Sequence, residues 1–202
     1  MLFRSANLVD AGHVLTAGLL TAPDKTDETR QFGLAYTVPM PERAGALTAH
    51  WARSTIGFGG LPGVANFTGP GHFAGLRYRH QFAPRRDYLS DLTIGIEDKS
   101  YSGSGLAANV SARPLTLAYG GHWEGQWTGW NYGLSLSQNL PGGGGNGDAA
   151  YADARPGASP NWTVLRIEGD YTRILTYDLR MIIRGRAQFA RSTLIPGEQI
   201  AL

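Results

Sequence analysis

Two runs near the end of the chain alternate between apolar and polar residues on either side of a short turn. One face carries mainly apolar side chains, namely Thr163, Leu165, Ile167, Tyr171, Leu179, Met181, Ile183 and Phe189. The other face carries charged and polar side chains, namely Arg166, Glu168, Asp170, Thr172, Arg180, Arg184, Arg186 and Gln188. A side-chain period of two around a short turn predicts an antiparallel β-hairpin with one apolar and one charged face.

The two strands of this hairpin are unusually long. Each has about 13 residues, whereas a soluble strand has roughly 5–6 and a tilted membrane-spanning strand needs about 9–11. An arginine facing lipid at mid-membrane would cost about 2–4 kcal/mol, so the charged face must point into a barrel lumen. We therefore expect the lumen-facing residues to be Arg166, Glu168, Asp170, Arg180, Arg184 and Arg186. If Glu168 opposes Arg184, both share a face and the turn holds an odd number of residues.

The same alternation recurs along the whole chain. Strands are predicted over residues 13–21, 30–38, 46–54, 72–82, 88–99, 115–123 and 130–137, which with the opening strand and the hairpin makes about ten. Short connections at 39–45, 83–87, 124–127 and 175–178 alternate with long ones at 55–71, 101–111 and 141–160. Long strands whose connections alternate in this way predict an all-β, antiparallel transmembrane β-barrel.

Three local features refine this prediction. The first short connection is expected to start at Pro39, because prolines are rare in central strands. The glycine run at 142–147 lacks the Lys-Ser/Thr of a phosphate-binding loop, so a flexible external loop is expected. Five tryptophans lie near strand ends, as the aromatic girdles of a barrel require, although a sandwich core would also hold tryptophan. They are Trp51, Trp123, Trp127, Trp130 and Trp162.

Composition narrows the function classes. The 202 residues include 18 Lys and Arg against 16 Asp and Glu, and this near-balance offers no case for nucleic-acid binding. Cysteine is absent, which excludes disulfides and thiolate metal sites. The five histidines show no metal-ligand spacing, and no Ser/His/Asp set is discernible. We expect no catalytic residues, no metal and no cofactor.

Two motifs carry a resemblance to a known family. Residues 194–199 read Leu-Ile-Pro-Gly-Glu-Gln, and residues 34–40 read Leu-Ala-Tyr-Thr-Val-Pro-Met. The first resembles the Leu-x-Pro-x-Glu-Gln-Phe pattern of two-partner-secretion outer-membrane transporters of the haemolysin-activator type, with Ile200 in place of the Phe. The second is similar to the Tyr-x-x-Pro-Leu that these proteins carry at a periplasmic turn.

The resemblance implies a fold, a function and a location. Residues 1–202 would form a partial barrel domain with about ten of 16 strands, and the two POTRA domains, the lid tip and the closing strands would lie elsewhere in a longer protein. The start of the chain has no apolar signal-peptide core, which fits an internal piece. The function implied is a pore in the outer membrane of a Gram-negative bacterium that exports a large unfolded haemolysin-like or adhesin-like partner protein.

The resemblance also assigns a role to the first motif. Pro196, Glu198 and Gln199 would anchor a loop that folds back into the pore. From the residues alone, Pro-Gly is also an ordinary turn signal. Likewise, the lumen-facing charges suit both a salt-bridge lattice that stiffens the wall and a polar surface along which a polypeptide slides.

Other functions remain open at this stage. Within membranes the alternatives are a barrel-assembly-type insertase and a plain porin. Outside membranes the same alternation fits a soluble β-sandwich adhesin or lectin whose apolar faces pack into a dry interior. A hydrolase that uses a histidine such as His72 is a more remote alternative.

Overall fold

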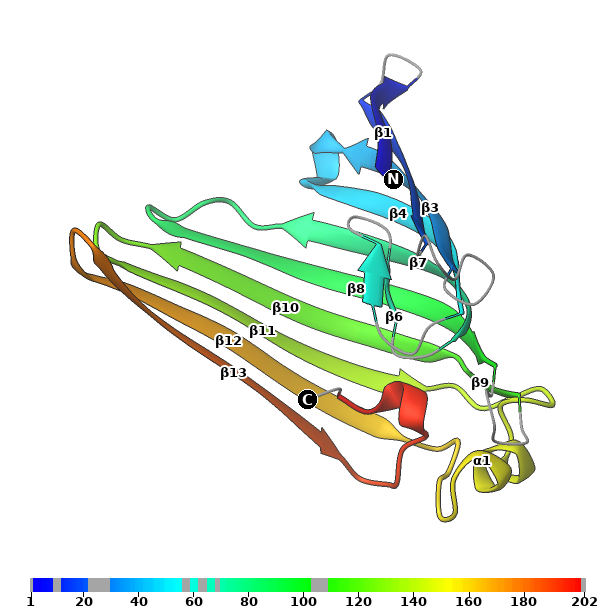
Figure 1. Ribbon diagram of the computed structural model, residues 1–202. Helices are drawn as coiled ribbons and strands as arrows, with labels where there is room; N and C mark the ends of the chain where they lie inside the picture. The colour runs from blue at the N-terminus through cyan, green and yellow to red at the C-terminus, as the bar shows by residue number, and fades with distance from the viewer. Residues whose placement is uncertain are drawn as a thin grey trace.

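The chain folds into one long, curved antiparallel sheet. The computed structural model describes residues 2–8, 12–21, 30–55, 59–61, 65–67, 70–102 and 109–200. Ten strands follow one another across the sheet in chain order, each antiparallel to its neighbour (Figure 1). They are β1 (Leu2–Leu8), β2 (His13–Thr21), β3 (Arg30–Met40), β4 (Gly45–Ser54), β7 (Gly71–Gln81), β8 (Tyr88–Tyr101), β10 (Pro114–Glu124), β11 (Thr128–Asn139), β12 (Thr163–Thr176) and β13 (Leu179–Ala190).

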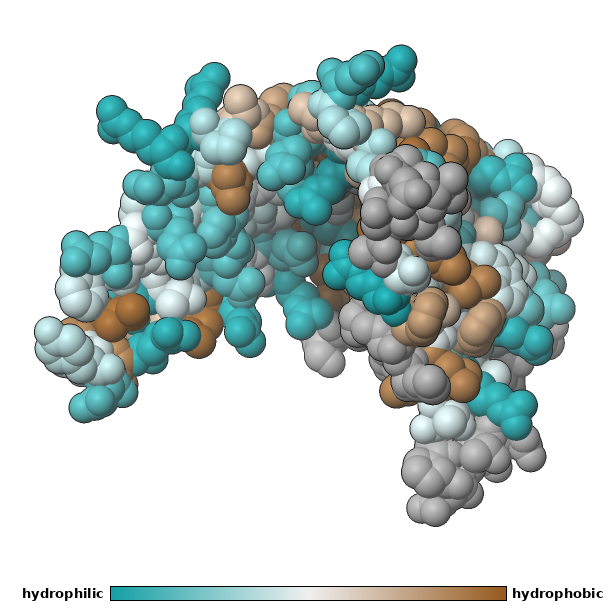
Figure 2. Space-filling model, turned by 90° about the horizontal axis from the view of Figure 1, so that it is seen from above, coloured by the Kyte–Doolittle hydropathy of each residue, from teal (hydrophilic) through white to brown (hydrophobic). Residues whose placement is uncertain are grey.

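This architecture confirms the predicted all-β, antiparallel fold and its strand count. The sheet is open, with β1 at one edge and β13 at the other, and seen from above it forms an arch around a hollow (Figure 2). Apolar side chains project from the convex face, where Leu117 and Ile183 are 47% and 56% exposed. Polar side chains such as Gln31, His50 and Ser54 are buried on the concave side.

The connections alternate in length as predicted, and the described residues of the long ones include secondary structure. The loop before β7 contains a small hairpin of β5 (Gly59–Leu61) and β6 (Ala65–Phe67), which contacts β2, β3 and β4. The loop before β10 contains β9 (Val110–Ala112), which pairs with β8. The loop before β12 contains helix α1 (Asp148–Ala154). Within the glycine run Asn146 is buried while Gly142, Gly143 and Gly144 are exposed, and Tyr151 of the helix that follows is buried as well.

Pro39 lies inside β3, and the turn predicted to begin there is shorter. Pro39 pairs with Ala46 of β4, and the turn proper is the 3-10 helix η1 (Pro41–Arg43) followed by Ala44 in the left-handed region at φ 47°. The pairing of β3 with β2 ends at Thr37 opposite Val14. Pro39 therefore lies where β3 has β4 alone as a neighbour, and this strand end tolerates the missing amide hydrogen.

The hairpin of β12 and β13 has the two predicted faces but a different register. Glu168 pairs with Arg186 and Asp170 pairs with Arg184, so the pairing of Glu168 with Arg184 that was considered from the sequence does not occur. The turn itself has two residues between Thr176 and Leu179, and a register shift follows Ile174. The shift absorbs one residue as a β-bulge, and this keeps the charged residues of both strands on the same face.

Candidate functional site

The segment after β13 turns back onto the concave side of the sheet. We call residues 191–200 the return segment; it contains the 3-10 helix η2 (Pro196–Glu198), drawn in red in front of the sheet in Figure 1. Its Glu198 carboxylate is 1% exposed. Lys99 Nζ lies 3.1 Å from Glu198 Oε1, and Arg166 donates to Oε2 at 3.1 Å. One carboxylate thus binds cations from β8 and from β12, two strands with β10 and β11 between them.

Tyr101 adds a second contact from β8 to the same turn. Its hydroxyl donates to Glu198 Oε1 at 2.8 Å and lies 3.1 Å from the carbonyl oxygen of Gly197. A Cβ on Gly197 would lie 2.4 Å from Cε1 of the Tyr101 ring. The turn therefore needs glycine at position 197 because the tyrosine ring lies directly against the backbone.

The backbone of the return segment is also hydrogen-bonded to side chains of the sheet. The Glu198 carbonyl accepts from Arg166 at 2.9 Å and from Gln188 Nε2 at 2.7 Å, and the Ile200 amide donates to Gln188 Oε1 at 2.7 Å. Gln188 lies on β13, so three wall strands hold the segment. Buried polar groups are stable when their partners are supplied, and here charged and neutral side chains of the sheet supply them together.

The ion pairs continue from Lys99 across the first half of the sheet. Glu97 Oε2 lies 3.5 Å from Lys99 Nζ, and Glu97 Oε1 lies 3.2 Å from Nε2 of the buried His50. His50 Nδ1 is 3.3 Å from an Arg77 guanidinium nitrogen. Because Arg77 has only donors to offer, Nδ1 is the acceptor in this contact. A connected set of side chains thus runs along the concave face from β4 to β12.

The resemblance grouped Pro196, Glu198 and Gln199 as one anchor, and the structure separates their contacts. Glu198 binds the wall directly. Pro196 is exposed and starts η2. The Gln199 side chain donates from Nε2 to the Leu194 carbonyl at 3.2 Å, a contact within the return segment itself.

The residues predicted to face the lumen lie on the concave face. Arg166 holds the return segment, and Arg184 Nε lies 3.2 Å from Asp170 Oδ1. One side of a polar groove of about 730 Å³ is lined by four charged residues, namely Glu168, Asp170, Arg184 and Arg186. The opposite side carries Arg79 and Asp91, with an Arg79 guanidinium nitrogen 2.6 Å from Asp91 Oδ1. The floor includes His122 and Asn131. Arg180 lines a smaller recess beside the turn between β10 and β11.

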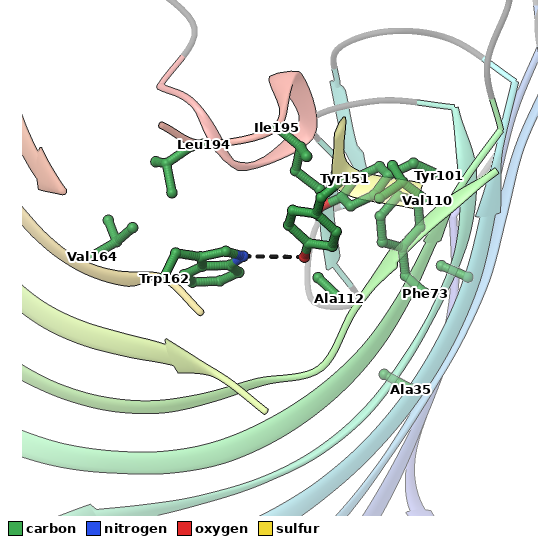
Figure 3. Close-up of a cluster of buried hydrophobic side chains, with 11 residues drawn as sticks. Ala35, Phe73, Tyr101, Val110, Ala112, Tyr151, Trp162, Val164, Leu194 and Ile195 are labelled. Atoms are coloured by element: carbon green, nitrogen blue, oxygen red, sulfur yellow. Dashed lines mark hydrogen bonds between the residues drawn. The ribbon is translucent and has the colours of Figure 1, made fainter. Parts of the chain in front are cut away.

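A buried cluster closes the concave side at the end of the sheet where the long loops lie (Figure 3). Trp162 Nε1 donates to the Tyr151 hydroxyl at 3.1 Å, and both side chains are almost fully buried. Burial raises the pKa of Tyr151 to about 12. Leu194 and Ile195 of the return segment belong to the same cluster. The prediction that Trp162 belongs to a girdle was therefore wrong, whereas Trp123, Trp127 and Trp130 are exposed near the short turns.

Asn139 joins the loop around α1 to the sheet. Its side-chain Nδ2 donates to Asn146 Oδ1 and to the Pro160 carbonyl, both at 2.7 Å, while its Oδ1 accepts from the Arg113 backbone amide at 2.6 Å.

Sequence reasoning did not single out Asn139, Tyr151, Lys99 or Tyr101. One signal was present: lysine occurs at just two positions, and Lys99 sits with Glu97 on the inward face of a predicted strand.

The described residues hold no group of three or more His, Asp or Glu side chains arranged to bind a metal ion. Within the same ranges no helix is both long enough and apolar enough to span a membrane. No protein-family model matches the chain. A search of curated proteins likewise finds no match.

Proposed function

We propose that this chain is a wall section of an outer-membrane β-barrel, and that the barrel is a pore through which an extended polypeptide is exported. The return segment would be the base of a loop that folds into the pore. The observation that carries the proposal is the distribution of side chains: apolar residues cover the convex face, while charged and amide side chains are buried or line the hollow. A protein surrounded by water has the opposite distribution.

The convex face supports a lipid environment in particular. Its exposed aliphatic residues include Leu76, Ile94, Ile96, Leu115, Leu117, Leu134, Leu136, Leu165 and Ile167. These residues lie at matching levels of adjacent strands, so they form a continuous band. Exposed apolar patches of more than a few hundred Å² are rare on soluble monomers and mark contact with a membrane or another protein.

The spacing of the two boundaries of the convex face on β8 supports an outer-membrane location. On β8 the convex face reads Tyr88, Ser90, Leu92, Ile94, Ile96 and Asp98. From Tyr88 to Asp98 there are ten residue steps (98 − 88), or about 33 Å at about 3.3 Å each. A strand tilt of about 40° reduces this to roughly 25 Å, the height of the lipid-facing band of outer-membrane barrels.

Each end of the band carries the residues expected at a membrane interface. At the end with the short turns, the Tyr88 hydroxyl lies 2.7 Å from that of Tyr119 and 2.6 Å from that of Tyr132. At the other end, Asp98 pairs with Arg113 at 3.0 Å. Amphipathic aromatic rings prefer the interface, and a solvated ion pair marks where the apolar region ends.

The concave groove suits a polypeptide in transit. Its charges occur as neighbouring acid and base pairs, Arg79 with Asp91 and Arg184 with Asp170. Such a wall has no large field of one sign that would retain either an acidic or a basic chain. Most residues that line the groove are charged, polar or glycine, and Leu89 is among the few exceptions.

The test uses the whole gene product that contains this chain. Expressed in a Gram-negative bacterium, it should resist extraction by high salt, dissolve in detergent and conduct ions in a planar bilayer. An unfolded polypeptide added to one side should then block the current in a voltage-dependent manner. A current that polypeptides do not affect would indicate a porin, and catalysed insertion of another barrel without a current would indicate an insertase. Recovery in the salt-washed soluble fraction would contradict the proposal and select a soluble adhesin or lectin.

A further inference from the structure

The loop between β11 and β12 contacts the return segment directly, although the two are far apart in the chain. Arg155, at the end of α1, donates to the Leu194 carbonyl at 2.9 Å. Three residues later, Ala158 forms a parallel β-bridge with Thr193. Tyr151 and Trp162 pack in one buried cluster with Leu194 and Ile195 (Figure 3). The contact therefore combines backbone pairing, a charged hydrogen bond and apolar packing.

The same loop is bound firmly to the sheet. Three backbone hydrogen bonds hold it. The backbone amide of Asn139 donates to the Trp162 carbonyl at 3.1 Å, and that of Leu140 donates to the Arg113 carbonyl at 3.0 Å. The backbone amide of Ser111 donates to the Gly145 carbonyl at 2.7 Å. Asn139 and Asn146 add the buried side-chain bonds described above. The loop therefore keeps its position on the sheet for as long as these bonds hold.

The return segment consequently has two separate attachments. Glu198 holds its far end to Lys99, Tyr101 and Arg166 on the wall. Arg155 and Ala158 hold its near end to the loop. Between them Ile195 is fully buried, so neither end can leave without disturbing this packing. Packed groups of this kind open together, as one cooperative unit.

We propose that loop 140–162 and the return segment form a two-part gate, in which the loop holds the return segment in its closed position. This inference rests on the proposed pore. The loop lies at the long-loop end of the sheet, where a ligand could reach it, and a change in its position is transmitted to Glu198 through Leu194 and Ile195. Release of the return segment from the wall then requires release of the loop as well.

Hydrogen exchange measured on the whole gene product tests the coupling without reference to conductance. Arg155→Ala removes a charged hydrogen bond, and the amides of residues 193–200 should exchange about tenfold faster, together with those of the loop. Asp153→Ala, on an exposed residue of the same helix, is the matched control and should leave exchange unchanged. Faster exchange in the loop with no change in residues 193–200 would overturn the coupling.

A reversible cross-link gives the opposite perturbation in a protein whose sequence has no cysteine. Ala158→Cys with Thr193→Cys places two cysteines at a β-bridge, where neighbouring backbones lie about 4.8 Å apart and a disulfide fits. Oxidation should slow exchange in residues 193–200 and lower the bilayer current, and a reductant should restore both. A disulfide between Leu117→Cys and Leu136→Cys, paired on the convex face, should change neither.

The outcomes separate the two proposals. If the oxidised and reduced forms exchange at the same rate in residues 193–200, the two-part gate is wrong. If exchange responds to the cross-link but the reduced protein carries no current, the coupling stands and the proposed pore fails.

Discussion

Lys99 and Glu198 are 99 residues apart in the chain, and Nζ of the lysine lies 3.1 Å from Oε1 of the glutamate. The glutamate side chain is almost completely buried, and Arg166 binds its second oxygen. One carboxylate thus links β8 and β12, which are not neighbours in the sheet. Its loss should loosen the return segment while the sheet ladder remains intact.

Replacement of the Glu198 carboxylate is the most direct test of its ion pairs with Lys99 and Arg166. Glu198→Gln keeps the shape but leaves Lys99 and Arg166 partly uncompensated, and breaking a buried pair costs about 3–5 kcal/mol. Glu97 still lies beside Lys99, so we expect about 2 kcal/mol, equivalent to a roughly 30-fold faster labelling of a cysteine placed at position 199.

The matched control for Glu198→Gln is Arg79→Ala. It breaks the Arg79–Asp91 pair, whose arginine is largely exposed, and such pairs contribute about 0–1 kcal/mol. Labelling at position 199 should remain at the wild-type rate. Equal effects of the two substitutions would contradict the role of the Glu198 ion pairs in holding the return segment.

A methyl group at Gly197 should displace the turn from the wall. The new Cβ would lie 2.4 Å from the Tyr101 ring, so either the ring or η2 must move. We expect Gly197→Ala to destabilise the return segment by about 1–3 kcal/mol, measured by hydrogen exchange. Gly144→Ala is the control, since nothing lies within 4 Å of its Cβ position. Adding Tyr101→Ala should relieve the clash, and a strictly additive double mutant would argue against direct contact.

A similar close contact stabilises the convex face. The Tyr132 ring lies over Gly121, where a Cβ would come within 2.4 Å of the ring. Gly121→Ala should displace Tyr132 from Tyr88 and lower the free energy of unfolding in detergent by about 1–3 kcal/mol. Gly185→Ala on the same face meets no atom within 4 Å and should be close to neutral. Unchanged unfolding of Gly121→Ala would contradict this role for Tyr132.

Adjacent residues of β10 allow the lipid-facing assignment to be tested at a single depth. Leu117 lies on the convex face and Ala118 on the concave face. If lipid covers the convex face, Leu117→Arg should lower stability in bilayers by about 2–4 kcal/mol, and Ala118→Arg should have a much smaller effect. Folding yield into lipid vesicles measures both. Equal tolerance of the two arginines would rule out a bilayer on the convex side.

Alkaline pH should loosen the cluster around α1. Burial raises the pKa of Tyr151 from 10.0 to about 12, so the folded state favours the neutral phenol. The stability that this group contributes is complete below pH 10 and is lost as the pH rises through about 12. Hydrogen exchange in residues 140–162 should therefore accelerate over this range, and Tyr151→Phe should reduce that acceleration. Tyr177→Phe, at a 98% exposed position, should leave it unchanged.

Much of the fold could be predicted from local pattern. A period of two assigns each side chain to a face, which is why Ile167 and Arg166 were placed on opposite sides of the wall without any structure. The alternation of short and long connections is similarly readable. Pro39 was misplaced because the rule against proline in strands depends on whether a neighbouring strand needs its amide. The register of β2 against β3, which ends the pairing at Thr37, is not visible in the sequence.

The site was less predictable because its contacts are long-range. The resemblance drew attention to Glu198, but its partners Lys99, Tyr101 and Arg166 lie 99, 97 and 32 residues away. The register of β12 with β13 depended on one bulged residue in the hairpin. The hydrogen bonds of Asn139 join four separate segments, and no local pattern distinguishes this asparagine from those on the surface.

The even number of strands on the main path constrains how the hollow can be enclosed. Because each of the ten neighbours reverses direction, β1 and β13 run opposite to each other. Both edges therefore run in the orientation for antiparallel pairing with each other, and hydrocarbon penalises any edge whose backbone groups stay unpaired. Any cylinder completed from this arch must insert zero or an even number of further strands between the two edges. An odd insertion would force one seam to be parallel.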